Sequence, residues 1–173
     1  MPALNFPTPS APGEVYTANG KTFVWNGVSW VNNTPRSFAG VNVNGSITER
    51  IEVAASAATG TINFEVKTYG LLYNTVNATE NWTLNVRGDS ATTLNNLLDV
   101  GQTVTITHVV AVGASSYLPT GFTVDGSAVS VKWQNSATLT AYTSSTVVYT
   151  YFIVKTASNT YTVLGSQENF VTA

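Results

Sequence analysis

The sequence WTLNV at residues 82–86 alternates large apolar side chains with polar ones. Successive side chains of a β-strand point to opposite faces, so this pattern predicts a strand with one buried and one solvated face. Two packed sheets satisfy both requirements, because each sheet hides its apolar face against the other. The stretch therefore predicts a sandwich of two sheets.

Segments rich in Val, Ile, Thr, Tyr and Phe lie on both sides of this strand and are separated by turn residues. No sustained helical periodicity interrupts them. We expect strands near residues 38–43, 46–54, 61–69, 71–76, 81–87, 103–112, 121–125, 127–133, 147–156 and 160–168. The fold class predicted for the main domain, residues 37–173, is therefore all-β: an antiparallel β-sandwich or jelly roll whose strand order the pattern leaves open.

Local signals add turns and one helix to this domain. Asn44-Gly45 and Asp125-Gly126 are dipeptides that supply the positive φ angles of two-residue hairpin turns. Leucines recur at helical spacing over residues 94–98, after Thr92 or Thr93 as a candidate N-cap. We therefore expect a single short helix in this segment.

The first 36 residues form a separate region with a different amino-acid pattern. Four prolines among the first thirteen residues disfavour helix and central-strand pairing, which predicts an extended, polyproline-like arm. Two type I′ turn signals follow, Asn19-Gly20 and Asn26-Gly27. They predict a small three-stranded β-meander near residues 14–18, 21–25 and 28–31.

This meander is expected to carry an aromatic plate. If both turns contain two residues, Tyr16 lies opposite Phe23 and Phe23 opposite Trp30, with Trp25 and Val28 on the same face. Three short strands are marginal in water, so such a plate needs a cover. Docking on a protein neighbour is favoured over stacking on sugar rings. The predicted partner-binding residues are Phe6, Tyr16, Phe23, Trp25 and Trp30.

The composition argues against several classes of function. The 173 residues are 43% hydrophobic but only 9% charged, against about 25% in typical proteins, so neutral hydroxyls and amides coat the surface. A net charge of −2 without a basic stripe argues against a nucleic-acid partner. No segment approaches a membrane span of about 18 apolar residues, and the start of the chain lacks a classical export signal. The absence of cysteine excludes disulfides and thiolate ligands.

No constellation of residues predicts catalysis. His108 is the only histidine and lies in a predicted strand, where a structural role is favoured over a catalytic one. A metal site would rest on carboxylates, and Asp89, Asp99 and Asp125 lack the spacing of a calcium loop. Arg87-Gly88-Asp89 spells an integrin-type tripeptide, but turn chemistry explains it equally well. We expect no enzyme activity, no cofactor and no resident metal.

Two parts of the chain resemble proteins of tailed bacteriophages. Residues 15–30 (VYTANGKTFVWNGVSW), preceded by Phe6-Pro7-Thr8-Pro9, look like a small module that recurs in phage virion proteins. A second part resembles structural proteins of aquatic phages, cyanophages especially. It comprises residues 80–89, 93–98, 101–108, 148–151 and 155–157. The resemblance implies a component of the virion exterior, assembled in the host cytoplasm, and brings no catalytic residue with it.

Within a virion, the sequence favours a capsid decoration protein that cements the head and binds the major capsid protein. The chain has neither the repeats nor the coiled-coil heptads by which a long fibre gains length. The resemblance also implies a homotrimer. The alternative is a tail fibre or receptor-binding subunit that recognises a host-surface glycan through loops such as residues 115–117 or 134–145.

Overall fold

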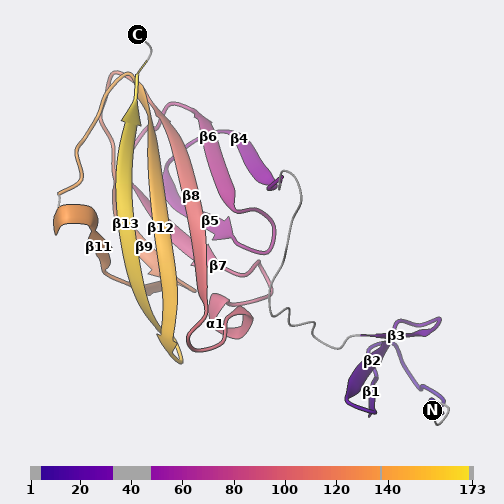
Figure 1. Ribbon diagram of the computed structural model, residues 1–173. Helices are drawn as coiled ribbons and strands as arrows, with labels where there is room; N and C mark the ends of the chain where they lie inside the picture. The colour runs from indigo at the N-terminus through magenta and orange to yellow at the C-terminus, as the bar shows by residue number, and fades with distance from the viewer. Residues whose placement is uncertain (1–4, 33–47, 137, 172–173) are drawn as a thin grey trace. The chain divides into compact units, whose positions relative to one another are not determined.

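A computed structural model describes residues 5–32, 48–136 and 138–171 (Figure 1). The chain divides into two compact units, residues 1–47 and 48–173. The strand expected at residues 38–43, the Asn44-Gly45 turn and the domain boundary expected between residues 36 and 37 lie outside the described residues.

The first unit contains the expected three-stranded antiparallel meander. Its strands are β1 (Val15–Ala18), β2 (Lys21–Trp25) and β3 (Trp30–Asn32), in the order β1-β2-β3. Asn19 and Gly20 have φ angles of 51° and 71° and join β1 to β2 as a two-residue turn. Tyr16 pairs with Phe23, as the sequence predicts.

The second turn of the meander is longer than predicted. It spans residues 26–29, because the Asn26 side chain accepts hydrogen bonds from the backbone N–H groups of Val28 and Ser29. Phe23 therefore pairs with Asn32, and the predicted pairing of Phe23 with Trp30 is wrong. Trp25 pairs with Trp30 instead, which leaves both on the same face as Phe23.

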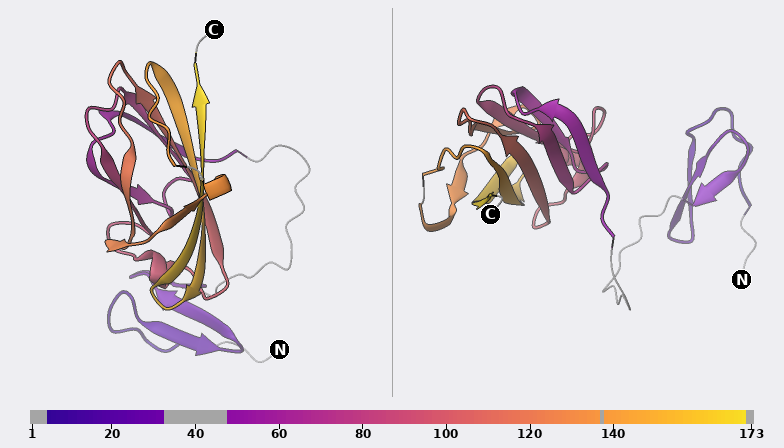
Figure 2. Two further views of the ribbon diagram at one scale, coloured as in Figure 1. Left: turned by 90° about the vertical axis from the view of Figure 1, so that its left-hand side faces the viewer. Right: turned by 90° about the horizontal axis from the view of Figure 1, so that it is seen from above.

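The second unit is a sandwich of two sheets, which Figures 1 and 2 show as separate layers. One sheet has six strands in the order β11-β13-β12-β8-β6-β4. They are β4 (Ile51–Ala57), β6 (Leu71–Val76), β8 (Thr103–Val112), β11 (Val131–Trp133), β12 (Ser145–Ala157) and β13 (Thr160–Phe170). The other sheet has the order β10-β9-β7-β5. It consists of β5 (Gly60–Glu65), β7 (Trp82–Arg87), β9 (Pro119–Val124) and β10 (Ser127–Ala128).

The core lies between these sheets and confirms the all-β sandwich. Trp82, Leu84 and Val86 of β7 are at most 1% exposed, as their alternation predicts. The Trp82 ring lies 5.9 Å from that of Tyr149 on β12, so the two layers meet through aromatic side chains. Buried aliphatic residues fill the rest of the core together with the rings of Phe64, Phe122 and Tyr151.

The sheets are mixed, so the antiparallel pairing expected for the sandwich holds only for part of it. Strands β8, β12 and β13 are antiparallel neighbours, whereas β4-β6-β8 and β5-β7-β9 are parallel, as is β11 with β13. From β4 to β9 the chain alternates between the sheets. The strand direction reverses at each crossing. Two neighbouring strands of one sheet are separated in the sequence by one strand of the other sheet, so they run in the same direction.

Two further elements sit beside the sheets. The helix α1 (Leu94–Leu97) is a single turn, and the Thr93 side chain caps it by accepting from the Asn96 N–H.

The strand expected over residues 127–133 is instead divided between β10 and β11, which belong to different sheets. The short 3-10 turn η1 (Gln134–Ser136) follows β11.

Candidate functional site

The five aromatic residues singled out in the sequence form one cluster in the first unit. Phe6, from the proline-rich arm, packs on the rings of Tyr16, Phe23 and Trp30 at centroid distances of 5.7, 4.9 and 5.8 Å. The Phe6 and Trp30 rings are nearly parallel, at 14°. The Trp30 indole N–H also donates to the Pro7 carbonyl oxygen over 3.3 Å. The arm of this chain thus lies on its own aromatic plate.

Only part of this aromatic cluster is hidden. Phe23 is 8% exposed, whereas Phe6, Tyr16, Trp25 and Trp30 are half-buried. The centroids of Trp25 and Trp30 are 5.8 Å apart, and each such ring pair contributes about 0.5–1.5 kcal/mol beyond area burial. The cluster is therefore preformed and still presents aromatic surface.

The opposite face of the meander is apolar as well. Val15, Val24 and Val31 pair across the three strands, and Val15 and Val31 are 65% and 41% exposed. Val28, predicted on the aromatic face, lies instead in the turn between β2 and β3 and is 84% exposed. The row of valines was not predicted from the sequence. Valine and aromatic residues alternate along these strands, however, and such alternation places them on opposite faces.

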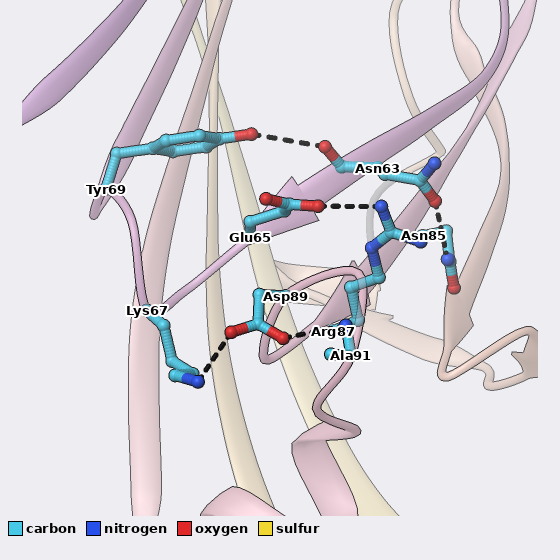
Figure 3. Close-up of polar contacts among 8 residues, drawn as sticks. All are labelled: Asn63, Glu65, Lys67, Tyr69, Asn85, Arg87, Asp89 and Ala91. Carbon is cyan, nitrogen blue, oxygen red and sulfur yellow. Dashed lines mark hydrogen bonds and ion pairs between the residues drawn. The ribbon is translucent and has the colours of Figure 1, made fainter. Parts of the chain in front are cut away.

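Figure 3 shows a ladder of polar side chains on the four-stranded sheet. The parallel register of β5 and β7 sets Asn63 beside Asn85 and Glu65 beside Arg87. Asn85 Nδ2 donates to Asn63 Oδ1 over 2.8 Å, and the Arg87 guanidinium donates to Glu65 Oε1 over 2.6 Å. These bonds tie the two strands together through their side chains.

The tripeptide Arg87-Gly88-Asp89 is part of this ladder. Arg87 is paired with Glu65, and Asp89 accepts from the Lys67 ammonium and the Ala91 N–H. The hydrogen bond from Lys67 lowers the pKa of Asp89 below its ordinary value. A Cβ at residue 88 would lie 2.7 Å from the Thr92 carbonyl oxygen, so the glycine is a packing requirement. The geometry agrees with turn chemistry.

His108 is completely buried between the sheets. Its Nε2 lies 2.8 Å from Asn74 Oδ1, while Asn74 Nδ2 donates to the Ser56 carbonyl oxygen. Burial lowers the pKa of His108 to about 3, so the ring is neutral at pH 7 and donates from Nε2. Its place in the core agrees with the structural role favoured by the sequence.

Lys155 is a buried cation that sequence reasoning missed. It is 6% exposed, and its ammonium donates to the carbonyl oxygens of Asn95 and Leu98 over 2.6 and 2.8 Å. At the other end of α1, Asp125 accepts from the N–H groups of Leu94 and Asn95. Lys155 of β12 and Asp125 of the turn between β9 and β10 thus hold the two ends of this single helical turn.

A cleft of about 630 Å³ opens where the chain passes from one sheet to the other between β10 and β11. Its walls come from β9, from the crossover at residues 128–131, and from Trp133 and Tyr151 of the six-stranded sheet. The sequence predicted one continuous strand here, so it gave no indication of a cleft.

No helix in the described part of the chain is both long and apolar enough to cross a bilayer. The described residues also contain no group of three or more His, Asp or Glu side chains placed to hold a metal ion. No protein-family model, curated protein or solved structure matches this chain.

Proposed function

We propose that the chain is a non-enzymatic structural protein of a phage virion that decorates the capsid exterior and attaches through its N-terminal unit. The observation that supports this role is the preformed aromatic cluster around Phe6 and Trp30, which remains half-exposed. Rigid aromatic anchors dominate the energy of protein interfaces, because they bury much area at little entropic cost. The major capsid protein is the proposed partner.

The sandwich supplies a body suited to the outside of a particle. Neutral side chains dominate it, and its one histidine is inaccessible to a substrate because it lies in the core. A protein that binds only the assembled shell stabilises that shell by mass action, without turnover. Attachment through one unit leaves the other free to cover the shell.

The outer face of the six-stranded sheet supports a homo-oligomer, for which we propose a trimer. Val53, Tyr73, Val109 and Val148 pair in one continuous row across β4, β6, β8 and β12. Phe152 and Leu164 form a second apolar pair, 39% and 45% exposed. Contact between copies would remove these side chains from water.

Attachment is tested with particles that incorporate variants of the full chain. Trp25→Ala combined with Trp30→Ala should weaken attachment by several kcal/mol, because both rings would lose their contacts. Leu97→Ala removes a 39% exposed apolar side chain from α1, outside both the meander and the face proposed for the trimer, and serves as the control. Deletion of residues 1–36 should abolish incorporation while the sandwich stays folded by circular dichroism. Normal incorporation of the deleted chain would contradict the attachment role.

The cementing role is tested by heating particles with and without the protein. Particles that lack it should release DNA at a lower temperature than decorated ones. Equal heat resistance combined with lost host adsorption would reject cementing and favour the receptor-binding alternative.

Light scattering tests the trimer: Val148→Lys should reduce the mass of the oligomer, whereas Thr61→Lys on the other sheet should not. A monomer in solution and on the capsid would contradict the trimer.

A further inference from the structure

The cleft beside the β10–β11 crossover has the size and construction of a small-molecule site. Its volume of about 630 Å³ lies within the range of roughly 300–1,000 Å³ that is usual for ligand pockets. It combines residues from both sheets, because the chain changes sheet at residues 129–130 directly above it. The site therefore depends on the two-sheet arrangement of the sandwich and on the connection between β10 and β11.

Two glycines shape this cleft. A Cβ on Gly121 would lie 2.4 Å from Thr83 Oγ1, so the glycine is what permits β9 to lie close to that hydroxyl. A Cβ on Gly165 would lie 2.7 Å from two carbon atoms of the Trp133 ring, so the ring rests directly on the backbone of β13. The Tyr151 ring then meets Trp133 edge-on at 5.7 Å. Trp133 is held in place from two sides.

The lining of the cleft is neutral and rich in hydroxyl groups. No described residue that lines it carries an ionised side chain at pH 7. Thr123 donates to Asn85 Oδ1, but the hydroxyls of Thr83, Thr120 and Ser130 have no protein partner among the described residues. The Tyr151 hydroxyl is buried and also lacks a partner among them. The cleft thus joins aromatic surface to hydroxyl groups that no other described residue engages.

We propose that this cleft binds a neutral saccharide. A sugar ring offers hydroxyls to the free threonine and serine groups and a C–H face to the indole of Trp133. A phosphate or carboxylate ligand would find no cation, and a purely apolar ligand would leave buried hydroxyls unpaired. The proposal is independent of attachment through the N-terminal unit.

The test is a titration of the full chain with neutral oligosaccharides, namely maltotriose, N-acetylchitotriose and mannotriose, followed by NMR. The chain has four tryptophans, and Trp133→Phe identifies the indole N–H signal of Trp133. We expect that signal to shift saturably for at least one sugar, with a Kd of about 1 mM or tighter. Shifts confined to Trp25 and Trp30 would move sugar binding to the aromatic cluster and overturn the proposal.

Variants at the rim separate binding from folding. Thr120 and Ser130 are exposed, so Thr120→Ala with Ser130→Ala should leave stability unchanged and weaken the sugar about tenfold. Thr61→Ala removes an exposed threonine from β5 and should not change affinity. The proposal fails if the double variant binds like the parent chain, if no neutral sugar shifts Trp133, or if glucuronate or a Ser/Thr-rich peptide binds as tightly.

Discussion

His108 is a neutral histidine that the fold keeps out of water, with its Nε2 hydrogen bond to Asn74. Its pKa is about 3 in the folded chain, against 6.5 for the ordinary side chain. Between these values the unfolded chain binds a proton that the folded chain does not. The free energy of unfolding must therefore fall as the pH drops from about 6.5 towards 3.

We predict that His108→Gln flattens this pH dependence. Glutamine retains an amide donor for Asn74 but does not titrate. The parent chain should lose at most about 5 kcal/mol of stability over this range, whereas the variant should lose little of it. Urea unfolding at a series of pH values measures the difference. The pKa of Asp89 is lowered in both proteins, so its contribution to the pH dependence is the same in each. If the variant loses as much unfolding free energy as the parent chain when the pH falls, His108 is not the responsible group.

Lys155 gives a second prediction at the scale of single residues. Lys155→Met preserves the aliphatic stem but removes the donor to the carbonyl oxygens of Asn95 and Leu98. Leaving buried acceptors unpaired costs about 1–3 kcal/mol, so the urea midpoint should decrease. Lys132→Met, at an exposed position of β11, is the control and should change stability by less than about 0.5 kcal/mol. Equal effects would contradict a special role for Lys155.

At the scale of elements, Gly165 controls the edge strand β11. Gly165→Ala would place a methyl group 2.7 Å from Trp133 and from Val131 Cγ1, so β11 must shift. We predict a loss of about 1–3 kcal/mol from overpacking and a red-shifted tryptophan emission. Gly70→Ala is the matched control, because its nearest contact would be an ordinary 3.6 Å to Glu49. Identical unfolding curves for the two variants would contradict this packing.

The elements show what the sequence could predict. Strand positions followed from local pattern. The alternation of side chains marked β7, and the Asp-Gly dipeptide marked the turn at residues 125 and 126, where the structure has φ angles of 51° and 82°. The order and direction of strands depend on which sheet each strand joins, and a half-buried pattern reads the same in either sheet. The parallel pairs were therefore missed.

The two candidate sites differ in how far local sequence pattern could predict them. The meeting of Tyr16, Phe23, Trp25 and Trp30 could be predicted, because adjacent strands with short turns bring such residues together. The contact of Phe6 with these rings could not, because the arm is not a strand of the meander. The register of β3 could not, because the Asn26 side chain closes a four-residue turn where a two-residue turn was expected. The cleft at Trp133 brings together residues 83 and 151, which no local pattern relates.

At the scale of the whole molecule, the division into two units has an experimental consequence. A chain that begins at residue 48 contains both sheets of the sandwich and its entire core. We predict that it unfolds cooperatively, with a Tm within a few degrees of that of the full chain, because one buried core sets the transition. Calorimetry measures this. Loss of the cooperative transition would show that the first 47 residues are needed for folding.

The alternation of β4 to β9 between the two sheets also determines how such a protein can grow. β4 and β5 are consecutive in the chain and form the same-side edges of their sheets, so one inserted strand pair before Ile51 would widen both sheets by one strand each. The antiparallel end, with β12 and β13, would remain untouched. A chain of this architecture can therefore be extended by whole pairs of strands, with one strand of each pair added to each sheet.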